Sequence, residues 1–133
     1  MKMNTFSTTD FQICVVLSAL GYKLIEIDKS QPRFVFHFED NPQIQTDIDK
    51  FYSGYSNSTL WPLFHYFPNK AEHHTSYWNQ YKEVNQLFAK TAMQFASNDA
   101  KLWVHDYQLM LVPQMLRNLD QDATIGFFLH TPF

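Results

Sequence analysis

The chain has 133 residues, enough for one modest domain, and 45% of them are hydrophobic. Aromatic residues make up 17%, which argues against disorder because rings supply the burial that offsets chain entropy. The net charge of −3 and the scattered basic residues exclude an electrostatic reason for binding nucleic acid or an anionic membrane. Cys14 is the only cysteine, so no internal disulfide can form, and a reducing cytoplasm is the natural compartment.

The first fifty residues predict a small αββα module. The apolar run at 13–20 is too short to span a bilayer and has no cleavage site, so we expect neither a membrane helix nor a signal peptide. N-cap residue types at 8–10 and a glycine at position 21 predict a helix between them. Residues 22–28 and 33–38 predict a β-hairpin, and a further helix is expected from position 41.

The remainder predicts a strand–helix–strand unit of a parallel sheet. Gly54 is expected to mark a break, and Pro62 favours a loop over a regular helix through residues 60–67. Apolar residues at three- and four-residue spacing predict one long helix over 73–96. Short strands at 102–105 and 125–130 are expected to be buried because they lack alternation, and a helix over 109–119 joins them.

Titratable side chains follow both predicted strands. His105 and Asp106 end the first strand, and His130 ends the second. Ligands of open α/β sheets bind beyond the carboxyl ends of the strands, so these side chains are candidates for a polar site. The plainer interpretation is that His105 and Asp106 cap the next helix, and the pattern alone weights the two equally.

A metal-dependent hydrolase is a second interpretation of the same residues. His65, His105, Asp106 and His130 are all potential Zn or Fe ligands, but no pair has the i, i+4 spacing of a specific metal motif. Trp61 alone would more often be a core residue than a ligand platform. The chain has no glycine-rich phosphate loop and no nucleophile elbow.

Three segments in order resemble one known family, the trehalose-6-phosphate synthases. They are YSNSTLWPLFHY at 55–66, WVHDYQL at 103–109 and IGFFLHTPF at 125–133. Several residues between them also fall at the family's spacing: Trp78, Tyr81, Val84, Asn85, Phe88 and Ala89. The resemblance covers about residues 50–133, whereas residues 1–50 do not match it and faintly resemble a small uncharacterised bacterial domain.

The resemblance implies a fold, substrates and roles for four residues. The fold would be a partial Rossmann-like parallel sheet, half of the acceptor domain (51–133) of a two-domain glycosyltransferase, preceded by the αββα module (1–50). Members transfer glucose from UDP-glucose to glucose 6-phosphate with retention, without a metal or other cofactor. Tyr52 would contact the acceptor phosphate region, Trp61 would pack beside the acceptor, Asp106 would accept hydrogen bonds from its hydroxyls, and His130 would contact the donor glucose.

Departures from the family limit what this chain is expected to do. The family's early arginine loop and glycine-rich loop do not appear in residues 1–50, and its UDP-binding domain is not present. We therefore expect no activity from the chain alone, with a non-enzymatic fusion or regulatory binding module as the alternative. An uncovered sheet would favour self-association. A natural fusion, a decayed gene and a chimera all fit this pattern.

Overall fold

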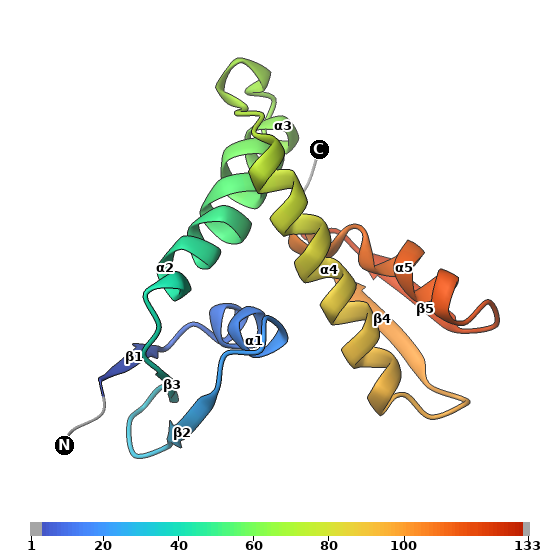
Figure 1. Ribbon diagram of the computed structural model, residues 1–133. Coiled ribbons are helices and arrows are strands. Elements are labelled where there is room, and N and C mark those ends of the chain that lie inside the picture. The colour runs from blue at the N-terminus through green and yellow to red at the C-terminus, as the bar shows by residue number, and fades with distance from the viewer. Residues whose placement is uncertain (1–3, 132–133) are drawn as a thin grey trace. The chain divides into compact units, whose positions relative to one another are not determined.

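The computed structural model describes residues 4–131 and divides the chain into two compact units, which meet in sequence between Ile48 and Asp49 (Figure 1). The chain is a mixed α/β protein with one antiparallel and one parallel sheet. None of the helices in the described part is long and apolar enough to cross a membrane. Assigning either unit to a functional domain stays a prediction.

The first unit contains a three-stranded antiparallel sheet and two helices. Its elements are β1 (Thr5–Thr8), α1 (Phe11–Ala19), β2 (Leu24–Asp28), β3 (Val35–Glu39) and α2 (Gln43–Ile48). The sheet order is β1-β3-β2, so the predicted hairpin of β2 and β3 is confirmed. Strand β1 was not predicted, because only its pairing with β3 turns this short polar segment into a strand.

Local signals fix both ends of α1. Asp10 is the N-cap, and its Oδ1 accepts hydrogen bonds from the amides of Gln12 (2.8 Å) and Ile13 (3.2 Å). At the other end Gly21 has a φ of 86°, which a residue with a side chain rarely adopts. The amides of Gly21 and Tyr22 return to the carbonyls of Ser18 and Leu17, a Schellman ending that confirms the predicted stop.

The core of the first unit is apolar and lies on one side of its sheet. Phe36 and Phe38 of β3 are buried together with residues of both helices: Cys14, Val16, Leu17, Ile44 and Ile48. Strand β2 pairs with β3 alone among the described strands, and its Leu24, Ile25 and Ile27 are each at least 36% exposed. A strand at the edge of a three-stranded sheet has few neighbours that could cover it.

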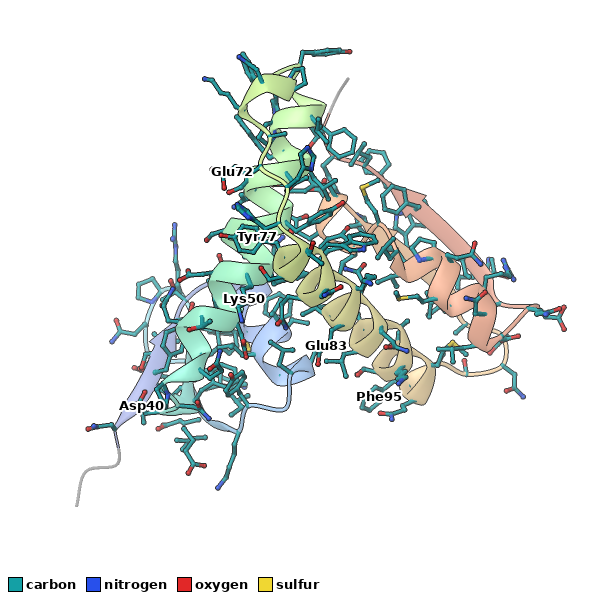
Figure 2. All side chains as sticks on the ribbon, turned by 45° about the horizontal axis from the view of Figure 1, so that its top comes forward. Asp40, Lys50, Glu72, Tyr77, Glu83 and Phe95 are labelled. Carbon is teal, nitrogen blue, oxygen red and sulfur yellow. The ribbon has the colours of Figure 1, made fainter. Side chains whose placement is uncertain are left out.

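Two sequence predictions are wrong at the start of the second unit. Gly54 does not break the chain but lies inside the π-helical segment η1 (Asp49–Leu60). A Cβ placed on Gly54 would lie 2.8 Å from the Tyr77 ring, so this glycine permits close packing; Tyr77 is labelled in Figure 2. Pro62 does not prevent a helix either, because it falls in the first turn of α3 (Trp61–Phe64). A backbone amide in the first turn has no acceptor within its own helix, so the missing N–H of proline costs nothing there.

Helix α4 is the centre of the second unit. It spans Thr75–Phe95 after the short 3₁₀ turn η2 (Pro68–Lys70), close to the predicted 73–96. Its buried residues recur every three to four positions: Tyr81, Val84, Asn85 and Ala89. Through this face α4 packs against η1 and α5, as Figure 1 shows, whereas Phe95 at its far end is 85% exposed (Figure 2).

The predicted strand–helix–strand unit is confirmed. Strands β4 (Lys101–His105) and β5 (Thr124–Phe128) are parallel neighbours, joined by the 3₁₀ turn η3 (Tyr107–Leu109) and α5 (Val112–Leu119). The prediction that both strands are buried is wrong, because Trp103 is 67% and Phe128 49% exposed. Helices α4 and α5 cover one face of this two-stranded sheet, where Val104, Val112 and Leu116 form the core with Ala89.

Candidate functional site

The carboxyl ends of β4 and β5 bring the predicted polar residues together. Nδ1 of His105 lies 2.9 Å from Nε2 of His130, and the two rings stack with centroids 5.2 Å apart. The Asp106 amide donates to the Phe128 carbonyl at 2.8 Å, which continues the pairing of the two strands. The predicted convergence of these residues on one sheet edge is therefore confirmed, whereas their roles in binding stay predictions.

Asp106 has an unusual backbone conformation. Its φ of 68° and ψ of 172° lie in a region that glycine occupies almost alone, at a cost of about 1–3 kcal/mol for other residues. Its Oδ1 accepts a hydrogen bond from the Tyr107 amide at 3.0 Å, so Asp106 does cap η3, as the plainer interpretation held. Strained backbone at a polar loop is found most often at ligand sites, which keeps the functional interpretation open beside the cap.

Tyr107 connects this edge to the segment that carries Tyr52 and Trp61. Its hydroxyl donates to Oδ1 of Asn57 at 3.1 Å, and its ring lies 6.3 Å from that of Phe64. Burial raises the pKa of Tyr107, and the nearby Tyr52 and Asp106 raise it further, so the hydroxyl remains a donor at neutral pH. Tyr52 therefore lies within electrostatic range of Tyr107.

Trp61 presents a partly exposed ring, with 43% of the residue accessible to solvent. It stacks on His65, whose ring centroid is 3.9 Å away and whose Nδ1 lies 2.7 Å from the Trp61 carbonyl. His65 is therefore engaged with its own helix. Within residues 4–131 no three His, Cys, Asp or Glu side chains are grouped closely enough to hold a metal, so the four candidate ligands do not form a metal centre.

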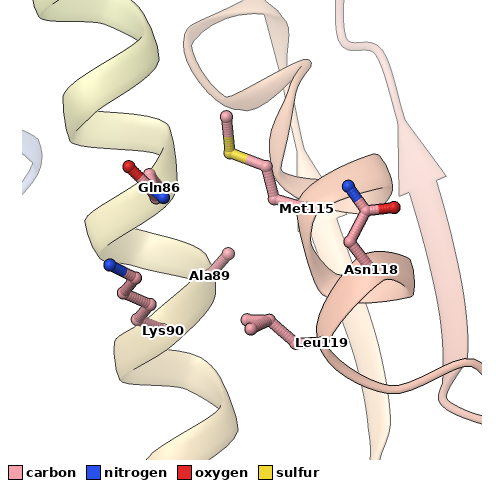
Figure 3. Close-up of a pocket in the computed structure, with 6 residues that line it drawn as sticks. All are labelled: Gln86, Ala89, Lys90, Met115, Asn118 and Leu119. Carbon is pink, nitrogen blue, oxygen red and sulfur yellow. The ribbon is translucent and has the colours of Figure 1, made fainter.

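Hollows in the second unit border α4, α5 and β4. Figure 3 shows a small hollow between α4 and α5, lined by Gln86, Ala89, Lys90, Met115, Asn118 and Leu119. A second, apolar hollow borders β4 and includes Trp103 and His105. Neither is lined by any of the four predicted binding residues, Tyr52, Trp61, Asp106 and His130.

Sequence reasoning gave Asn57, Tyr81 and Asn85 no role of their own. All three are polar residues in helices, and Tyr81 and Asn85 are almost completely buried, with exposures of 1% and 0%. One signal was available for Asn85: it falls in the apolar stripe of α4, between Tyr81 and Ala89, where an unpaired amide would be costly. A polar residue in such a stripe indicates a buried hydrogen-bonded partner.

The chain is similar to trehalose-phosphate synthases in sequence and in structure. The trehalose-6-phosphate synthase of Mycobacterium tuberculosis is 44% identical over 126 residues, covering 86% of this chain and 25% of that protein. An alpha,alpha-trehalose-phosphate synthase from Burkholderia xenovorans in complex with glucose-6-phosphate has a TM-score of 0.61 at 33% identity, over 80% of this chain and 23% of that one. A structure from E. coli bound with UDP-2-fluoro glucose has a TM-score of 0.65 at 30% identity, over 91% and 29%.

The extent of these matches corrects one prediction. The family match covers residues 25–133, so residues 25–50, which were expected to lie outside the family, are part of it. The chain spans about a quarter of the length of the Mycobacterium tuberculosis relative. Because the matched residues make up most of its length, the chain belongs to glycosyltransferase family 20.

Proposed function

We propose that this chain forms the acceptor side of a glucosyl-transfer site that makes trehalose 6-phosphate from UDP-glucose and glucose 6-phosphate. The observation that carries the proposal is the linkage of two segments 50 residues apart: Tyr107, next to Asp106, donates to Asn57, in the segment between Tyr52 and Trp61. The similarity to a synthase in complex with glucose-6-phosphate supports the choice of acceptor.

Each proposed contact follows from the chemistry of its side chain. Asp106 caps η3 through Oδ1, and a carboxylate that accepts from sugar hydroxyls makes stronger hydrogen bonds than a neutral group. The exposed ring of Trp61 offers an apolar face for the carbon skeleton of the acceptor. Tyr52 supplies a hydroxyl for the phosphate region. His130 lies beside His105 at the sheet edge, from where it would contact the donor glucose.

The proposal includes a cytoplasmic location for the protein and a transfer reaction that needs no metal. A cytoplasmic protein would meet nucleotide sugars and hexose phosphates directly, and a free Cys14 is compatible with a reducing compartment. The proposed transfer uses hydrogen-bond donors and acceptors to orient two sugars, with no role for a metal ion.

Titration of the isotope-labelled chain with glucose 6-phosphate, followed by amide NMR shifts, tests the acceptor site. We expect shifts in residues 52–61 and 105–107. Asp106→Asn should weaken binding by roughly ten- to a hundredfold, because a hydrogen bond to a charged group contributes more than a neutral one. Asn118→Ala, in the hollow between α4 and α5, is the control and should leave affinity unchanged. Shifts centred on that hollow, or none anywhere, would contradict the proposed acceptor site.

A turnover assay tests the expectation that this chain binds the acceptor but does not transfer glucose by itself. The 133-residue polypeptide by itself should release no UDP from UDP-glucose and glucose 6-phosphate, because transfer needs both substrates held in reacting geometry and the chain spans a quarter of its relatives. UDP release above background that Asp106→Ala abolishes would show that the polypeptide also holds the donor.

A further inference from the structure

The loop after β4 is only partly fixed by its own hydrogen bonds: Asp106 accepts from the Tyr107 amide through Oδ1 and from the Leu109 amide through its carbonyl. Helix α5 begins at Leu111–Val112 without a side-chain cap, and Pro113 follows in its first turn. The first amides of a helix need partners from elsewhere. Asp106, at the start of this loop, has the backbone conformation of a glycine. The remaining backbone groups of residues 107–111 need partners from outside the loop.

Two buried side chains of α4 supply the missing partners. The Tyr81 hydroxyl donates to the Tyr107 carbonyl at 2.6 Å and accepts from the Met110 amide at 3.1 Å. The Asn85 amide group donates to the Gln108 carbonyl at 3.0 Å, and its Oδ1 accepts from the Leu111 amide at 3.2 Å. Four backbone groups of the loop thus end on two side chains of one helix.

The Tyr81–Asn85 pair is itself rigidly held. The Asn85 amide group also donates to the Tyr81 carbonyl at 2.8 Å, and both residues are buried. The Tyr81 ring packs against Phe51 at 6.0 Å and Tyr55 at 4.8 Å between ring centroids. Burial raises the pKa of Tyr81 well above its usual range, so its hydroxyl keeps its proton at every physiological pH.

We infer that Tyr81 and Asn85 are positioning residues for Asp106: by clamping the backbone of residues 107–111 to α4, they hold Asp106 in its positive-φ conformation at the acceptor edge. The expected effect on the binding of glucose 6-phosphate rests on the proposed function. The clamp itself is a property of the unliganded chain. Loss of the clamp lets Asp106 relax to an ordinary negative φ, which lowers the fraction of molecules competent to bind.

The backbone of Asp106 can be measured directly in the unliganded chain. The nuclear Overhauser effect between its own amide and Hα protons is strong only when φ is positive. In the wild type we expect this signal to be strong and the Met110 and Leu111 amides to be protected from hydrogen exchange. Tyr81→Phe, which removes only the hydroxyl, should weaken the Asp106 signal and speed exchange at Met110 by about two- to tenfold.

Two controls separate positioning from general stability. Tyr55→Phe removes a hydroxyl from the same aromatic cluster, and Val84→Ala creates a cavity on the buried face of α4. Val84→Ala should lower stability more than Tyr81→Phe does, yet both controls should leave the Asp106 signal unchanged. A strong Asp106 signal that persists in Tyr81→Phe and in Asn85→Ala, or unprotected Met110 and Leu111 amides in the wild type, overturns the inference.

Measuring the affinity for glucose 6-phosphate is a separate test of the inference. If a tenth of the molecules keep Asp106 at positive φ, the apparent affinity of Tyr81→Phe falls about tenfold, whereas Tyr55→Phe binds as the wild type does. Absence of binding to the wild type would reject the proposed function and leave the Asp106 signal to decide the clamp. Unchanged affinity in Tyr81→Phe, with the wild type binding, counts against the clamp.

Discussion

The two units of this chain are stabilised in different ways. In residues 4–48 every buried side chain is hydrophobic, and the helix ends are fixed by local signals such as Asp10 and Gly21. In residues 49–131 four polar side chains are buried as well: Ser56, Thr59, Asn85 and Gln108. Apolar packing tolerates exchange of similar shapes, whereas a buried polar group needs one particular partner. The buried residues of the second unit, which carries the candidate site, therefore tolerate fewer substitutions than those of the first.

The sharpest test of this difference exchanges buried residues for apolar ones of similar size. Asn85→Leu leaves the Gln108 carbonyl and the Leu111 amide without partners and should destabilise the second unit by about 3 kcal/mol or more. Ile44→Leu in the first unit should cost less than about 1.5 kcal/mol. Chemical denaturation followed by hydrogen exchange in each unit measures both. Equal losses would remove the distinction.

A smaller effect is expected at Thr59, whose hydroxyl donates to the Glu72 carbonyl in the buried part of the second unit. Thr59→Val keeps the shape and removes the donor, so it should cost about 1–3 kcal/mol. Ser58→Ala, next to it, removes a hydroxyl that is exposed and should cost less. Tryptophan fluorescence follows this unfolding, since all three tryptophans lie in the second unit. A Thr59→Val chain as stable as the wild type would contradict the comparison.

Substitutions at Gly21 and Gly54 test two different causes of destabilisation, backbone strain at the first and steric crowding at the second. Gly21→Ala should cost about 1–2 kcal/mol from its positive φ alone, because open space surrounds it. Gly54→Ala should cost about 1–3 kcal/mol, because the new methyl meets the Tyr77 ring and the Asp49 carbonyl. Asparagine, which tolerates a positive φ, should restore part of the loss at position 21 but aggravate it at 54. Thermal melts of the four variants measure this, and the reverse order at either site would refute the assignment.

The smallest effect concerns pH in the first unit. Burial, followed by the hydrogen bond to Asp47 and its charge, raises the pKa of Tyr22 from 10 to about 12. Because the folded state favours the protonated phenol, this stabilisation is complete below pH 10 and is lost as pH rises towards 12. The side chain is only partly buried, so solvent screens the interaction and the loss should be small. The difference in stability between wild type and Tyr22→Phe should shift over this window; a constant difference would argue against the Tyr22–Asp47 contact.

The sequence determined the types of several elements, the family and the strand-end residues. Periodicity in α4, the local caps of α1 and the apolar β4 and β5 each depend on neighbours within a few positions, so they can be recognised without a fold. The same reasoning placed His105, Asp106 and His130 on one edge, because parallel strands bring their carboxyl ends together.

Only the tertiary structure decided the backbone conformation and exposure of residues at which contacts with distant residues override the local sequence preference. Gly54 continues a helix because Tyr77 packs on it, and β1 exists only through its pairing with β3. Trp103 and Phe128 are exposed because only one face of the β4–β5 sheet is covered by helices. The positive-φ backbone of Asp106 and the clamp from Tyr81 and Asn85 arise from hydrogen bonds between residues over 20 positions apart, which no local pattern encodes.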